Sequence, residues 1–243
     1  MFSELTLDNK IYVVKIRKTE MNRIENYGLS NQTSFGMKKP LKSIEILQRK
    51  AKNVYPHISP YEFEQRLYRQ NENISTPLLK ILKKIQIKLD AFRLEMKQGI
   101  YPQKKLIENM KQNKIGNGGE EVDLATIIGK LNGQKNIFSG RINGLDHGVA
   151  FITDKIVKNG EILFLKNKDA IIIDPQLGIT DYAGNYYTKL KEIMGEQYKR
   201  QAKYNAGLCI IPRNNHSIKE LTITDLKTNY PELLIKDYEP VQM

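Results

Sequence analysis

The sequence predicts an α+β fold in which helices pack against an antiparallel sheet, and two observations lead to this prediction. Residues 41–111 show the apolar spacing of helices, interrupted by prolines and glycines. After Gly116 the pattern changes to one further helix and then to short strands separated by Asn-Gly turns. We expect residues 1–111 to form an N-terminal strand and a helical layer. Residues 112–243 should form the part that carries the candidate site, and the two parts together one compact unit.

The composition is that of an ordinary globular protein. Apolar residues make up 40% and charged residues 27% of the 243 residues, which is close to the average for folded domains. The single cysteine, Cys209, excludes an intrachain disulfide and a cysteine-based zinc cluster. The chain shows no basic segment followed by a long apolar run and no apolar stretch of membrane-spanning length. We therefore expect neither a cleavable signal peptide nor a transmembrane segment.

The N-terminal part has one clear strand and one strong helix. Ile11–Val14 is the clear strand-like run within residues 1–40. The best helix starts at Ser75, a good N-cap, and Gly99 stands where a C-terminal cap would lie. Its apolar residues form one continuous stripe, which predicts a face buried in the core: Leu78, Leu82, Ile85, Leu89, Phe92 and Met96.

The C-terminal part should begin with a helix and continue as a sheet. Glu120–Leu131 has apolar residues at helical spacing, with Gly133 beyond its end. The later elements are a strand at 145–152, a strand at 170–173, a helix at 186–194 and a strand through Cys209.

The pairing of the first two strands would set the position of two polar residues. Asn159-Gly160 predicts a hairpin turn that places His147 opposite Ile171. His147 and Asp174 would then emerge at the same edge of the sheet. Residues 167–169 form either a bulge or a second turn, and a second turn would break this simple pairing.

Three short blocks contain residue types that suit nucleophilic catalysis. The first, at residues 116–120, reads Gly-Asn-Gly-Gly-Glu and precedes a helix. A helix start carries partial positive charge and unpaired N–H groups, which lower the pKa of a thiol and stabilise an oxyanion. The second block is Leu-Asp-His-Gly-Val-Ala-Phe at 145–151, and the third is Ile-Ile-Asp-Pro at 172–175. Together they supply a histidine and a carboxylate beside that helix start.

In residues and order the three blocks resemble those of papain-like cysteine hydrolases among secreted bacterial effectors, a likeness that covers about a quarter of the chain. The resemblance implies a papain-like fold, with His147 as the base and Asp174 as the group that orients it. It also implies export by a specialised system into a host cell. There the protein would act on a host protein as a protease, a glutamine deamidase or a transglutaminase-like enzyme. Asn117 is a candidate further donor to the oxyanion.

The first block departs from the family at its most important position. The family typically has Gly-Asn-Cys-Gly-Glu there, so Gly118 stands where the resemblance places the nucleophilic cysteine. Glycine has no side chain that could attack a carbonyl, and we therefore expect this chain to be catalytically inactive. Gly118 belongs either to a natural pseudoenzyme or to a chain in which the cysteine was substituted. Cys209 lies in an apolar run and is predicted to be a core thiol rather than a replacement nucleophile.

The formal charge of +12 supports a second hypothesis, a non-catalytic binding module that docks an acidic protein or an anionic membrane. Nucleic acid is a weaker expectation, because the lysines are spread along the chain without interleaved aromatic residues. His57 and His216 have no partners at ligand spacing, so we expect no metal site. Residues 116–119 lack the ending of a P-loop, and no cofactor is expected.

Overall fold

A computed structural model describes residues 2–7, 10–15, 39–57, 59, 76–97, 103–142, 145, 147–155, 163–164, 170–202, 209–212 and 223–242. The chain divides into two compact units, Met1–Met37 and Lys38–Met243. The first unit contains an antiparallel pair of strands, β1 (Phe2–Leu7) and β2 (Lys10–Lys15). The strand predicted at Ile11–Val14 is confirmed by β2. β1 was not predicted, because its apolar residues do not alternate regularly with polar ones.

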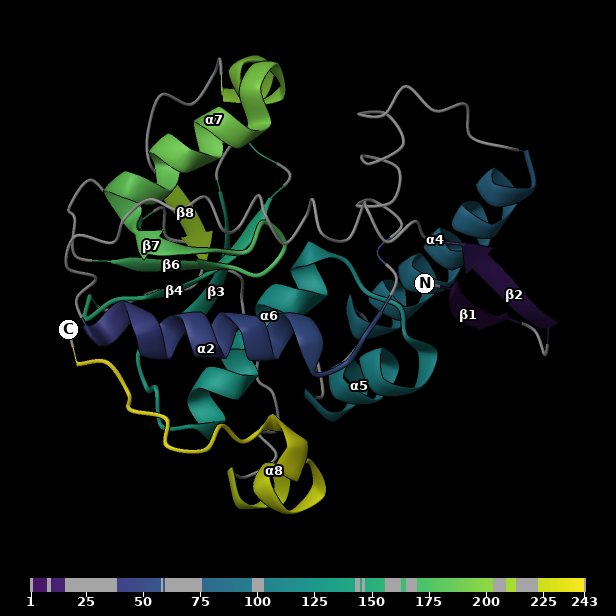
Figure 1. Cartoon of the computed structure of the whole chain (residues 1–243). Helices are drawn as coiled ribbons and strands as arrows, with labels where there is room; N and C mark the ends of the chain where they lie inside the picture. The colour runs from purple at the N-terminus through teal and green to yellow at the C-terminus, as the bar shows by residue number, and fades with distance from the viewer. Residues whose placement is uncertain are drawn as a thin grey trace. The chain divides into compact units, whose positions relative to one another are not determined.

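The second unit is built on an antiparallel sheet with the strand order β5-β8-β3-β4-β6-β7 (Figure 1). Every neighbouring pair in it is antiparallel. The strands are β3 (Ile137–Ile142), β4 (Gly148–Ile152), β5 (Leu163–Phe164), β6 (Ile171–Asp174), β7 (Ile179–Tyr182) and β8 (Cys209–Pro212). The predicted α+β class is confirmed, including the strand through Cys209.

Among the described residues, the helices of this unit are α2 (Lys39–Asn53), α4 (Thr76–Lys97), α5 (Gln103–Glu108), α6 (Gly118–Leu131), α7 (Ala183–Ala202) and α8 (Ile223–Asn229). A π-helical turn (Asn109–Asn113) follows α5, and a 3-10 turn (Pro231–Leu233) follows α8. α4 and α6 confirm two predicted helices, whereas α7 is longer at both ends than expected. Within the described residues no helix has the length and hydropathy needed to cross a membrane.

Both faces of the sheet are covered by helices (Figure 1). Ala150 and Ile152 of β4 belong to the core shared with α2 and α6. Val149 and Phe151, on the opposite face of the same strand, pack in a second core with α7. A strand buried on both faces has apolar residues without alternation, which is why the sequence of β4 is a continuous apolar run.

The predicted apolar stripe of α4 is confirmed over its described part. Leu82, Ile85 and Leu89 are buried. Phe92 is partly buried against the core of α2 and α6. The predicted caps of this helix and the side chains of its two outermost apolar residues lie outside the described residues.

The pairing of β4 with β6 is antiparallel as predicted, but the predicted register is wrong. Ile152, and not His147, lies opposite Ile171. The physical reason is that β5, between these strands in the chain, pairs with β8 instead of β4. The connection is therefore not the simple hairpin that the prediction assumed. The turn expected at Asn159-Gly160 lies outside the described residues.

Candidate active site

The structure brings His147 and Asp174 into direct contact. His147 immediately precedes β4, although the prediction had placed it inside a strand, and Asp174 is the last residue of β6. Because β4 and β6 are antiparallel neighbours, the start of one meets the end of the other. The distance from His147 Nε2 to Asp174 Oδ2 is 2.6 Å, and both residues are buried. The expectation that they share one edge of the sheet is confirmed.

Three donors converge on the Asp174 carboxylate. Besides His147, the Tyr186 hydroxyl on α7 donates to Oδ2 over 2.8 Å. The Leu177 N–H donates to Oδ1 over 2.9 Å. This last bond closes a turn with Pro175 after the aspartate, a common arrangement of Asp-Pro sequences. The carboxylate is thus fixed from both sides and can hold the imidazole in one orientation.

The orientation of His147 decides which ring nitrogen can exchange a proton with a substrate or nucleophile. Nε2 faces Asp174, so a proton exchanged with a substrate or nucleophile would pass through Nδ1. The backbone is also anchored, because the His147 carbonyl accepts a hydrogen bond from Ile142 N over 2.9 Å.

Gly118 is the first residue of α6, two residues before the predicted start of that helix. Asn117 is the N-cap, and its N–H donates to Glu120 Oε2 over 2.9 Å. Arg93 of α4 binds the same carboxylate with two hydrogen bonds, of 2.7 and 2.8 Å. The helix start is therefore held by a bidentate ion pair, a strong and directional contact.

The space beside Gly118 is filled by Gln176. A Cβ added to Gly118 would overlap the Gln176 carboxamide oxygen and lie 2.9 Å from its Cδ. Gln176 is two residues beyond Asp174, so position 118 lies against the turn that carries the aspartate. Glycine at this position therefore has a structural explanation as well, namely that it makes room for the glutamine side chain.

Two residues before position 60 contact the N-cap of α6 and the turn that packs against it. Lys52 Nζ donates to the Gln176 carbonyl over 3.1 Å, and Ser59 Oγ donates to Asn117 Oδ1 over 2.6 Å. Asn117 thus acts in capping, and its role as an oxyanion donor stays a prediction.

His57 forms a second buried contact with α6. Its Nε2 lies 3.0 Å from Glu121 Oε1, and its Nδ1 lies 2.9 Å from the Tyr55 carbonyl. A carbonyl can only accept, so Nδ1 carries a proton. The contact with Glu121 then requires another proton, on Nε2 or on the carboxyl group. This pair ties residues 55–57 to the helix start.

Sequence reasoning missed Gln176, Tyr186 and the pair of His57 with Glu121 as parts of this region. Gln176 had a weak signal, since it directly follows the Asp-Pro dipeptide. Tyr186 had none beyond its helical spacing. His57 has no carboxylate at ligand spacing along the chain, and its partner Glu121 is 64 residues away in the sequence, so the sequence held no signal for this contact.

The arrangement can position a base and polarise a carbonyl, but it supplies no attacking atom. The His147–Asp174 pair can take up and return a proton, and the start of α6 offers backbone N–H groups. Gly118 provides no nucleophile.

Across the described ranges, no group of three or more His, Cys, Asp or Glu side chains has an arrangement suited to a metal ion. His216 and the side chain of Cys209 lie outside those ranges. No family model, curated protein or solved structure matches this chain significantly.

Proposed function

We propose that this chain is a papain-like cysteine hydrolase scaffold without its nucleophile, which binds a host protein but does not cleave or deamidate it. The observation that carries the proposal is the buried His147–Asp174 contact of 2.6 Å, located beside the turn that packs against the start of α6. A base, its orienting carboxylate and a helix N-terminus are the three supports that a thiol nucleophile requires. Secretion into a host cell is part of the same proposal and rests on the resemblance of the three blocks.

In a form with cysteine at position 118, His147 would take the thiol proton at Nδ1. The thiolate would attack the carbonyl carbon of a peptide bond or a glutamine side chain, and the backbone N–H at position 118 would stabilise the oxyanion. The carbon–nitrogen bond would then break as the imidazolium returns its proton to the leaving amine or ammonia. Water, deprotonated by His147, would hydrolyse the thioester and regenerate the thiol. Asp174 would keep the imidazole oriented through all of these steps.

In the chain as it stands the first covalent step is absent, and binding is what the site can still provide. Gln176 presents a carboxamide next to Gly118, where the reacting part of a substrate would lie in an active form. A bound substrate must therefore displace the Gln176 side chain. Its carboxamide is at the end of a flexible side chain, so we expect this movement to require little energy.

The test is to restore the nucleophile. Gly118→Cys is made in a Cys209→Ala background, so that the introduced thiol is the only one in the chain. A peptide with an electrophilic carboxyl terminus serves as the probe, and labelling is followed by mass spectrometry. We expect labelling that falls at least about a hundredfold when His147 is replaced by glutamine, because general base catalysis is lost. Glutamine can still donate to Asp174 but cannot carry the proton.

Two further variants make the outcome specific. Gly184→Cys places a thiol at another helix start, the second residue of α7, where an added Cβ meets no atom within 4 Å. We expect this thiol to label slowly and independently of His147. Gln176→Ala in the Gly118→Cys chain should increase labelling, because it removes the overlapping carboxamide. Equal labelling at the two positions, or labelling at position 118 that does not depend on His147, would show that the proposed site is wrong.

A further inference from the structure

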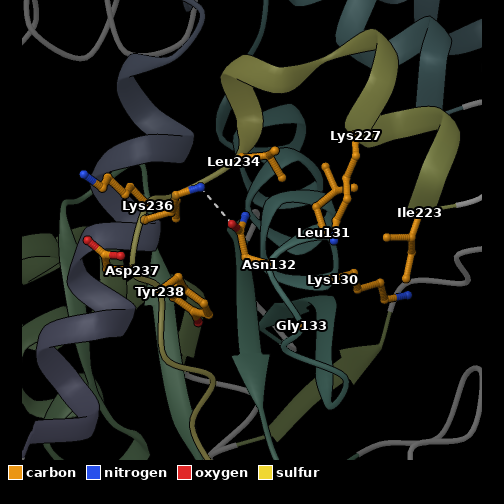
Figure 2. A pocket seen from close by; sticks show the side chains of 11 residues that line it. Lys130, Leu131, Asn132, Gly133, Ile223, Lys227, Leu234, Lys236, Asp237 and Tyr238 are labelled. Atoms are coloured by element: carbon orange, nitrogen blue, oxygen red, sulfur yellow. Dashed lines mark hydrogen bonds between the residues drawn. The ribbon is translucent and has the colours of Figure 1, made fainter.

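Figure 2 shows the residues that line a groove with a volume of about 670 Å³. The groove lies at the other end of α6 from Gly118. It is formed by the last residues of α6, by α8 and by the chain segment 234–238. At a rise of 1.5 Å per residue, the length of α6 places the groove about 20 Å from position 118. It is therefore separate from the candidate active site.

Two side-chain amides hold the C-terminal segment in place and so preform the groove. Asn132 donates to the Leu233 carbonyl over 3.1 Å and accepts from Ile235 N over 2.7 Å. The side chain of buried Gln134 forms both of its bonds with a single residue. It donates to the Val241 carbonyl over 2.9 Å and accepts from Val241 N over 2.8 Å. Each amide satisfies two backbone groups of the C-terminal segment, as a paired strand would do. A ligand would thus meet a groove that needs little ordering on binding.

The lining combines positive charge with exposed apolar surface. Lys130, Lys227 and Lys236 line the groove together with a single acidic residue, Asp237. None of these lysines forms an ion pair within the described part of the chain. Two large apolar side chains of the lining are exposed to solvent, Ile223 at 54% and Leu234 at 37%. In Figure 2, Lys227, Lys130 and Ile223 lie on one side of Asn132, and Lys236 and Asp237 on the other.

We propose that this groove binds an acidic segment of a partner protein, with carboxylates at the lysines and an apolar side chain against Ile223 and Leu234. The excess of lysines over acidic residues in the lining outweighs the partial negative charge at the end of α6. Nucleic acid fits less well. Tyr238, the aromatic residue of the lining, directs its hydroxyl to Gln134 at 3.3 Å and is partly buried, whereas base stacking needs open aromatic faces. The proposal does not depend on the chemistry at position 118.

The test uses the full chain and a fluorescent peptide of alternating Glu and Leu residues, followed by fluorescence anisotropy. The groove variant combines Lys130→Gln, Lys227→Glu and Lys236→Glu. We expect about a tenfold loss of affinity, because each ion pair on an exposed surface contributes only a small part of the binding free energy. Ile223→Ser, which leaves the charge unchanged, should weaken binding several-fold. The same peptide with Gln in place of Glu should bind weakly, and affinity should fall as salt is added.

A matched control separates the groove from the general basic charge. Lys155→Gln, Lys42→Glu and Lys83→Glu change the net charge by the same amount at exposed lysines elsewhere. This control should retain binding within about twofold, since only long-range attraction is reduced. Equal losses of peptide affinity in the two triple variants would overturn the proposal in favour of a diffuse basic surface. Binding to anionic vesicles and oligonucleotides alone, without binding to the peptide, would overturn it in the same way. Thermal melting of each variant checks that the fold is intact.

Discussion

Replacing Asp174 with alanine is expected to lower the free energy of unfolding by about 3–5 kcal/mol, the usual result of breaking a buried charged contact from one side. The substitution removes the acceptor that His147 and the Tyr186 hydroxyl share, and both of these residues are buried. It also removes the acceptor for Leu177 N–H in the turn after β6. Urea denaturation followed by circular dichroism measures the change.

Milder substitutions in the same hydrogen-bond network should cause smaller losses of stability. Tyr186→Phe removes one hydroxyl and should cost about 1 kcal/mol, because Asp174 keeps its other donors. Asp174→Asn keeps the shape and one acceptor oxygen, so its cost should lie between the two. If Asp174→Ala changed the stability by less than Tyr186→Phe does, the aspartate would not be the centre of this network.

Replacing His57 with alanine is expected to have an effect of similar size, about 3–5 kcal/mol, for a related reason. Glu121 is only 2% exposed, and its Oε2 has no hydrogen-bond partner among the described residues. Without His57 its Oε1 would lose the contact of 3.0 Å as well. A carboxyl group would then remain buried with neither oxygen paired. Urea denaturation of the variant gives the change in free energy.

A second substitution distinguishes this cause from simple loss of packing around His57. Glu121→Met removes the buried carboxyl group and keeps an unbranched side chain of similar length. Added to His57→Ala, it should recover about half or more of the lost stability, since a buried ion pair can be replaced by apolar groups at little cost. If the double variant were less stable than His57→Ala alone, the unpaired carboxyl group would not explain the loss.

The sequence predicted the elements of the fold better than their pairing. α6 and β4 were predictable because each has a strong local pattern, a helical repeat in one and a continuous apolar run in the other. The β4–β6 register was not predictable, because it depends on where β5 pairs. β5 pairs with β8, which lies far away in the chain. Local sequence carries no information on that pairing.

In the candidate site, too, features that depend on local sequence could be predicted and contacts between distant elements could not. His147 and Asp174 could be placed together despite the wrong register, since the beginning of one strand and the end of its antiparallel neighbour share an edge under either pairing. Contacts that join distant elements could not be predicted. Arg93 reaches Glu120 from α4, and His57 reaches Glu121 across 64 residues of sequence. Their partners are set by the packing of the helices.

We propose that the start of α6 and the His147–Asp174 pair form one site suited to a thiolate. The most direct test is the pH dependence of alkylation of the thiol in Gly118→Cys, with Cys209→Ala as background. We predict a thiol pKa at least about one unit below the ordinary value of about 8.5, and a return towards that value when His147 is replaced by glutamine. We also predict that this pKa is lower than that of the thiol in Gly184→Cys. The same thiol pKa at both positions, with no effect of replacing His147, would show that position 118 and the His147–Asp174 pair do not form such a site.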